Sequence, residues 1–238
     1  GEAVVVTQEV DDIISSPIEI ELPLSGYTIE EGREIELMEQ VTSEVAAQLN
    51  SRSTNYISTK IPYAYNYVDG GTRINHIDRQ SNHGSHVAGI AAANRFIKSG
   101  DEFVDAAETV KAVGMAPDAQ ILVMKVFGSG GGAYDSDYFA AIEDALVLEA
   151  DAANLSLGSS APGFTYAGTT YQTVLNGLVQ NPVDSHMILS ISAGNAGASD
   201  DYAAHKLYED DVNFYTGGSP GSFLNSLGVA AAQNTLTE

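Results

Sequence analysis

The sequence contains no cysteine and no tryptophan, and only 10 of its 238 residues are lysine or arginine. The lack of cysteine excludes thiol catalysis, disulfide bonds and zinc sites built on cysteine. Against the 10 basic residues stand 32 acidic ones, which gives a formal net charge of −22. Because so few cations cannot neutralise a phosphate backbone, nucleic acid is not expected as a partner. The acidic surplus is typical of a solubilising surface.

Long apolar runs are also missing. No stretch is long enough to predict a membrane-spanning helix, and the first residues show no secretory signal. A signal peptide that is removed after export would leave no trace, so these two absences do not fix the compartment. Hydrophobic residues make up 44% of the 238, which suffices for one large α/β domain with a single core.

The most informative stretch runs from Asn82 to Asn94, where His83-Gly84-Ser85-His86 precedes a run of small apolar residues. Alanine favours helix and lets a neighbouring element approach closely, so the run predicts a tightly packed helix with His83 at its start. An imidazole titrates near neutral pH, and a rigid support lets it take a proton from a hydroxyl nucleophile with little reorganisation. His83 is therefore a candidate general base.

This stretch resembles the histidine motif of the subtilisin-like serine peptidases, usually His-Gly-Thr-His-Val-Ala-Gly, with Ser85 in place of threonine. Three further segments resemble the next landmarks of that family, in the same order: Val123–Gly128, Asn154–Gly158 and Ser192–Gly197. The resemblance is strongest over residues 61–232, whereas residues 1–60 diverge. Lys60–Tyr67 more specifically resembles the lactocepin-type cell-envelope proteinases of Gram-positive bacteria.

The resemblance implies a three-layer α/β fold with a mostly parallel central sheet and helices on both faces. It implies a serine endopeptidase that cleaves polypeptides through a Ser/His/Asp triad, with His83 as general base. The side-chain amide of Asn195 would donate to the oxyanion of the tetrahedral intermediate; the ordinary alternative is a turn with a left-handed asparagine. An extracellular or cell-envelope location in a bacterium is implied as well.

Two further segments are implied in substrate binding. Ser156-Leu157-Gly158 matches the segment whose backbone binds substrate as an added β-strand; without the resemblance, it is simply a strand end before a turn. The loop Gly128–Gly132, which includes Gly130, flanks the peptide cleft in the family, and its glycines let a substrate backbone approach closely. A nucleotide site is not indicated, because neither a Walker motif nor GxGxxG is present. We expect both segments, His83 and Asn195 to converge on one groove.

Apolar runs separated by helical stripes predict a parallel sheet independently of the resemblance. The expected core strands are Ile121–Val126, Ala153–Leu157 and Met187–Ile191, with a crossover helix within Asp135–Ala150. The other expected elements are strands at Val4–Val6, Ile61–Tyr67 and Leu227–Ala232, a turn at Asp69–Gly71, amphipathic helices within Gly32–Asn50 and Tyr171–Leu178, and polar loops at Lys98–Thr109 and Asp200–Gly221.

The aspartate motif of the resembled family is absent. In subtilisin-like enzymes the first core strand ends in an aspartate followed by a small residue and glycine, and that aspartate orients the histidine. If Val4–Val6 is this strand, Thr7 and Gln8 stand where the aspartate belongs. The nearest carboxylates, Asp11 and Asp12, are the candidates for a shifted aspartate; the alternative is that both are solvated loop acids.

The nucleophile motif is absent too. Nothing after Ala196 matches Gly-Thr-Ser-Met-Ala, and the two glycine-preceded serines there, Ser219 and Ser222, lack its surroundings. We therefore expect residues 1–238 to be an incomplete peptidase domain of a longer parent protein, and we expect this chain alone to be inactive. The alternative is a pseudo-peptidase that binds extended peptides or has only a structural role.

The sequence implies no organic cofactor. Carboxylate-rich loops suit calcium, but no spacing specifies a calcium site or any other metal site. His76 and Asp78 lie just upstream of His83; an exposed loop position is the preferred interpretation, and a metal site formed by the two is the alternative. The sequence does not indicate an oligomeric state or a substrate preference.

Overall fold

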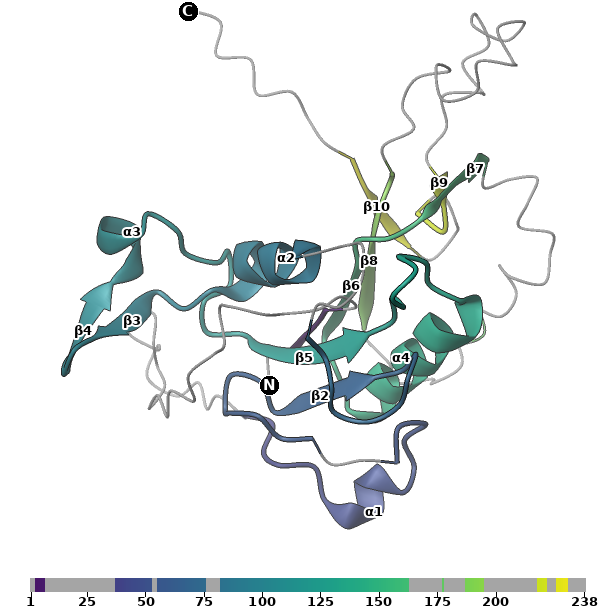
Figure 1. Cartoon of the computed structure of the whole chain (residues 1–238), viewed down its shortest axis with the longest axis horizontal. Helices are drawn as coiled ribbons and strands as arrows, with labels where there is room; N and C mark the ends of the chain where they lie inside the picture. The colour runs from purple at the N-terminus through teal and green to yellow at the C-terminus, as the bar shows by residue number, and fades with distance from the viewer. Residues whose placement is uncertain are drawn as a thin grey trace, which may run out of the picture. The chain divides into compact units, whose positions relative to one another are not determined.

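The computed structural model describes residues 3–6, 37–52, 55–75, 82–162, 177, 187–194, 218–221 and 226–230. Contacts divide the chain into two compact units, Gly1–Ala153 and Asn154–Glu238. Both units contain parallel β-strands, which Figure 1 shows as arrows. The chain has an α/β fold, as its alternating apolar runs and helical stripes predicted.

The first unit is built around strand β5 (Gln120–Lys125), which lies between β1 (Ala3–Val6) and β2 (Tyr63–Asn66) and is parallel to both. All six residues of β5 are buried, as expected for a parallel strand covered on both faces. The three strands predicted here from apolar runs are confirmed, with ends that differ by one or two residues.

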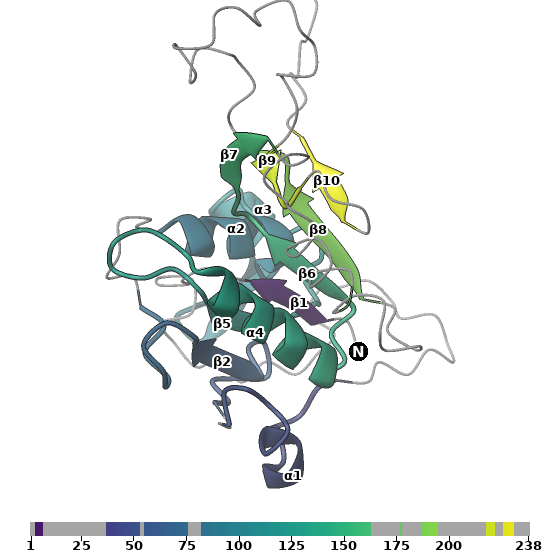
Figure 2. The same ribbon diagram turned by 90° about the vertical axis from the view of Figure 1, so that its right-hand side faces the viewer.

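Two helices cover these strands on opposite faces, α2 (His83–Ala92) on one and α4 (Asp135–Val147) on the other, as Figures 1 and 2 together show. On the α2 side, Ala88 and Ala92 form one buried cluster with Ile121 and Val123. Both helices were predicted from the sequence. The expected turn after β2 is also confirmed, since Gly70 and Gly71 adopt φ of +77° and +88°.

The helix predicted within residues 32–50 is wrong in extent. Among the described residues of this range, 37–50, only α1 (Ser43–Ala46) is helical, and residues 37–41 have no regular structure. The cause is the side chain of Gln120, which accepts from the Met38 N–H (2.7 Å) and donates to the Met38 carbonyl (3.0 Å). These two bonds replace the helical bonds of Met38, so the helix begins only after Thr42, whose hydroxyl caps it.

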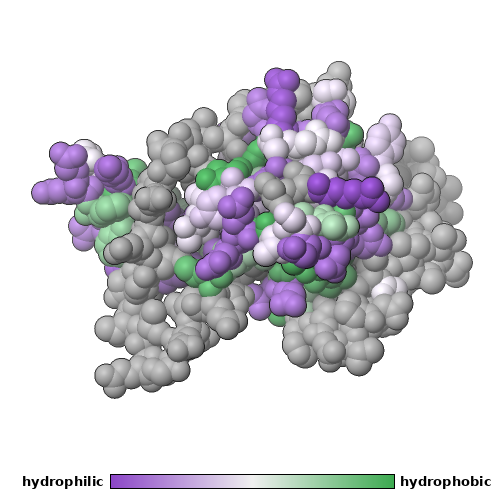
Figure 3. All heavy atoms as spheres, turned by 90° about the horizontal axis from the view of Figure 1, so that it is seen from below, coloured by the Kyte–Doolittle hydropathy of each residue, from purple (hydrophilic) through white to green (hydrophobic). Residues whose placement is uncertain are grey.

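The polar loop predicted at residues 98–109 is also wrong. Strands β3 (Phe96–Ser99) and β4 (Glu102–Asp105) form an antiparallel hairpin, followed by α3 (Ala106–Thr109). We call this segment the arm. The Asp105 carboxylate caps α3 through the N–H of Ala107 (2.8 Å) and binds Arg95 Nε (3.2 Å). Figure 3 shows mostly hydrophilic side chains on the arm around a small hydrophobic patch.

In the second unit, β8 (Ile188–Ser192) lies between β10 (Leu227–Val229), its parallel partner, and β6 (Ala152–Leu155). The strands expected here are present, with ends shifted by a few residues. A short antiparallel pair joins β7 (Ser159–Pro162) to β9 (Gly218–Ser219), so part of the loop expected at residues 200–221 is a strand. The helix expected at residues 171–178 lies outside the described residues except Gly177, which is helical.

Lys60 belongs to the first unit and lies just before β2. Its ammonium group donates to the carbonyls of Pro117 and Ala119. Burial lowers the pKa of Lys60 to about 8, although the nearby charge of Asp118 opposes this shift. An unfolded lysine titrates near 10.5, so between pH 8 and pH 10 the folded protein binds fewer protons at Lys60 than the unfolded chain does.

The free energy of unfolding is therefore expected to gain about 2 kcal/mol from Lys60 as the pH rises from 8 to 10. The variant Lys60→Met should lack this gain, and urea unfolding at both pH values measures it. Lys98→Met, at an exposed position on β3, is the control and should keep the gain of the parent chain. Equal pH dependence in Lys60→Met and the parent chain would contradict the prediction.

Candidate active site

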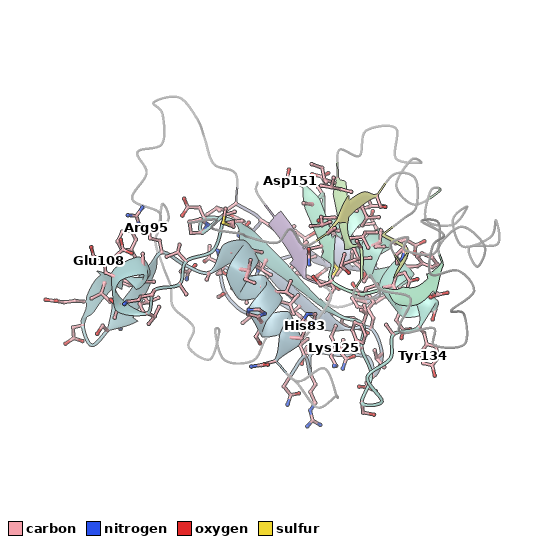
Figure 4. The ribbon with its side chains drawn as sticks, turned by 90° about the horizontal axis from the view of Figure 1, so that it is seen from above. His83, Arg95, Glu108, Lys125, Tyr134 and Asp151 are labelled. Carbon is pink, nitrogen blue, oxygen red and sulfur yellow. The ribbon has the colours of Figure 1, made fainter. Side chains whose placement is uncertain are left out.

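His83 is the first residue of α2, as the sequence predicted, and its side chain is exposed. Gly84 and Ser85 behind it are buried, so the helix is anchored directly below the imidazole. Figure 4 labels His83 at the start of α2 and Lys125, the last residue of β5. An exposed imidazole on a packed helix needs little reorganisation to transfer a proton.

A strap of three residues, 114–116, closes the C-terminal end of α2. Its consecutive N–H groups donate over 2.9 Å to three carbonyls at the end of the helix: Gly114 to Ala93, Met115 to Ile90 and Ala116 to Ala91. Carbonyls at a helix end have no partner within the helix, so the strap satisfies groups that would otherwise depend on water. A Cβ on Gly114 would lie 2.2 Å from the Ala93 nitrogen, so this close approach requires glycine.

The glycine loop, residues 128–132, is a closed turn. The Gly128 N–H donates to the Gly132 carbonyl (3.0 Å), and the Gly131 N–H donates to the Gly128 carbonyl (2.8 Å). Gly131 has φ of +79°, in the left-handed region that favours glycine. Gly130 is exposed, and a Cβ there would meet no atom within 4 Å. The backbone around Gly130 is thus open to an approaching chain.

In the second unit, Ser156-Leu157-Gly158 directly follows β6. The hydroxyl of Ser192, at the end of β8, donates to the Leu157 carbonyl (3.1 Å). The next residue, Ala193, accepts from the N–H of Gly218 (2.8 Å) at the start of β9. These bonds tie the ends of β6, β8 and β9 into one frame. The family motifs did not predict the bond from Ser192 to Leu157. Its signal in the sequence is a serine at the end of an apolar strand.

The structure describes five of the eight candidate site residues: His83 and Gly130 in the first unit, and Ser156, Leu157 and Gly158 in the second. The other three, Asp11, Asp12 and Asn195, lie outside the described residues, as do His76 and Asp78. Gly194, immediately before Asn195, has φ of +88°. The convergence of the candidate residues on one groove stays a prediction.

Within the described parts of the chain, no three His, Asp or Glu side chains lie together as metal ligands would. Calcium binding therefore stays a prediction from the acidic composition. In the same parts, no helix is long and apolar enough to cross a membrane.

The chain combines an α/β fold with a histidine at the start of a helix of small residues. Comparison with known families shows which class of protein has this combination. The model of the subtilase family, Peptidase S8, matches residues 42–237. This match covers most of the chain, and the chain belongs to the subtilase family.

Among its relatives, the chain is 36% identical over 185 residues to the PI-type proteinase of Lactococcus lactis subsp. cremoris. The alignment covers 76% of this chain and 9% of that proteinase, so the chain spans a small part of its relative's length. The minor extracellular protease Vpr of Bacillus subtilis (strain 168) is 31% identical over 158 residues, 66% of this chain and 15% of Vpr.

Among solved structures, an S41 psychrophilic protease matches with a TM-score of 0.49 and 26% identity, over 76% of this chain and 50% of that chain. Sphericase matches with a TM-score of 0.47 and 26% identity, over 73% of this chain and 47% of that chain.

Proposed function

We propose that the parent protein is a serine endopeptidase and that this chain carries its general base, His83. The observation that carries the proposal is the position of His83, exposed at the first residue of α2 within a family match over residues 42–237. In such an enzyme the histidine takes the proton of the serine hydroxyl as the serine attacks the peptide carbonyl. The histidine then returns that proton to the leaving amine.

The other roles follow the family's arrangement. The amide of Asn195 donates to the oxyanion as the tetrahedral intermediate forms. The backbone of Ser156-Leu157-Gly158 and the backbone of the glycine loop around Gly130 each bind an extended peptide by main-chain hydrogen bonds. Two observations support these roles: the frame that holds Leu157 through Ser192, and the open space around Gly130. Either Asp11 or Asp12 orients His83, unless that carboxylate comes from elsewhere in the parent protein.

A second function is favoured by one specific observation, namely that the 238 residues contain neither the family's aspartate motif nor its serine motif. In that case the domain binds extended peptides without cleaving them. The sequence of the parent gene on both sides of this segment separates the two functions. An Asp-Ser/Thr-Gly strand and a Gly-Thr-Ser-Met helix there would support the peptidase.

An extracellular or cell-envelope location is part of the same proposal. It is supported by similarity to a protease that is named extracellular, Vpr. The substrate is a polypeptide, and the acidic charge of −22 disfavours strongly acidic substrates by repulsion.

The 238-residue chain by itself is expected to hydrolyse no peptide, because triad residues act as a unit and the serine motif is absent from it. The purified chain is incubated with a fluorophosphonate probe and a broad peptide library, beside its His83→Ala variant and an active subtilisin. The subtilisin should be labelled, whereas neither form of the chain should react. Labelling of a serine in the chain that disappears in His83→Ala would contradict the prediction and return attention to Ser219 and Ser222.

A further inference from the structure

The chain continues beside β5 after β2 has ended at Asn66. The Tyr67 N–H donates to the Lys125 carbonyl (2.9 Å), which extends the ladder beyond the pair Asn66 and Lys125. This register places Val68 beside Gly128, the first residue of the glycine loop. A Cβ on Gly128 would stand 3.3 Å from Val68 Cγ1, so Val68 packs directly against the first residue of the loop.

The same segment is also fixed to the element that follows the loop. The Tyr67 hydroxyl donates to Asp144 Oδ2 (2.7 Å), and Asp144 is fully buried on α4. That carboxylate also accepts from the backbone N–H groups of Asn50 (2.6 Å) and Ser51 (3.1 Å). Burial raises the pKa of Tyr67 well above its ordinary value, so the hydroxyl keeps the proton that it donates.

Asn66 fixes the backbone of this segment. Its side chain is almost completely buried, and its Oδ1 accepts from the N–H groups of Val68 (3.0 Å) and Asp69 (3.1 Å). Its Nδ2 donates to the Arg73 carbonyl (2.8 Å). Every hydrogen-bonding group of the Asn66 side chain thus stabilises the turn that carries Val68.

We propose that Val68 is a positioning residue for the peptide-binding cleft, because it packs against Gly128, where the glycine loop begins, and is itself held by a fixed segment. Val68 contacts the loop at Gly128, and the bond from Tyr67 to Asp144, late in α4, fixes the segment that carries Val68. This contact, the brace, keeps the backbone around Gly130 in the form that accepts an extended peptide. This inference rests on the proposed function, since it takes the glycine loop to be part of the cleft.

The variant Val68→Ala removes the methyl groups that contact Gly128 and should loosen the loop without touching His83. In the purified chain, hydrogen exchange of the Gly128 and Gly131 amides, the two donors within the loop, should become about tenfold faster. The double variant Val68→Ala/Gly128→Ala should restore slow exchange, because the new methyl group fills the vacated space. Val104→Ala, at another half-buried valine on β4, is the control and should leave both amides unchanged.

In the parent protein, Val68→Ala should raise KM for peptides about tenfold and leave kcat within about twofold, since a displaced loop weakens binding rather than chemistry. Unchanged exchange at Gly128 and Gly131 in Val68→Ala would overturn the brace. Faster exchange with an unchanged KM would overturn the role of the loop in the cleft. A parent protein without any peptidase activity would overturn the proposed function, while the exchange measurement would still decide whether Val68 braces the loop.

Discussion

Replacing His83 by alanine in the parent protein is expected to lower kcat for peptide hydrolysis by at least about 10⁴. In subtilisin, where this loss has been measured, removing the histidine alone lowers kcat by about 2 × 10⁶. The effect is large because a serine hydroxyl is a weak nucleophile until a base takes its proton. KM should change little, because the proton moves only on the way to the transition state.

The measurement is the rate of cleavage of an unfolded polypeptide by the parent protein and by its His83→Ala variant. Ile90→Ala is the matched control, because Ile90 lies on the same helix and is 56% exposed. It should keep kcat within about twofold, as surface substitutions usually do. If His83→Ala kept more than a tenth of the activity, His83 would not be the general base.

Local patterns predicted the first unit well wherever neighbours in sequence decide the structure. The run of β5 is apolar because both faces of the strand are covered, and the small residues of α2 are there because the helix packs closely on β5. Both signals lie within a dozen residues. The position of His83 at the helix start followed from the same local pattern.

The predictions failed where a distant partner decides. Nothing near Met38 reveals that Gln120, 82 positions later, bonds to both of its backbone groups. The arm was mistaken for a loop because its strands have only four residues each and alternate weakly. Arg95 and Asp105 pair across its base although they are ten positions apart, and no local pattern indicates this pair. In both cases the two partners are present in the sequence, but no sequence pattern indicates that they bond to each other.

The same limit applies to the candidate site. Motifs supplied the residues that a peptidase uses, but they did not supply the contacts that hold those residues in place. The strap at Gly114 and the brace at Val68 each depend on close approach between segments that no local pattern connects. The strap is the easier of the two to test through stability alone.

Replacing Gly114 by alanine is expected to destabilise the chain by about 3 kcal/mol. The new Cβ would lie 2.2 Å from the Ala93 nitrogen and 2.5 Å from the Cα and carbonyl carbon of Ala92. All three are backbone atoms, which cannot move aside as a flexible side chain can. The strap must therefore withdraw from α2, and the carbonyls of Ile90 and Ala91 lose their partners.

Urea unfolding followed by circular dichroism and by tyrosine fluorescence measures this effect, since the chain has 12 tyrosines and no tryptophan. Gly132→Ala is the matched control: a Cβ on Gly132 would meet no atom within 4 Å, and this variant should stay within about 0.5 kcal/mol of the parent chain. Equal stability of the two variants would show that the strap can withdraw at no cost. A large loss in Gly114→Ala alone would identify the strap as the anchor of α2.

His83 lies at the opposite end of that helix, about 15 Å away along its axis. A shift at the anchor would then tilt the helix and move the imidazole, so the same variant should lower kcat in the parent protein even at temperatures where it remains folded.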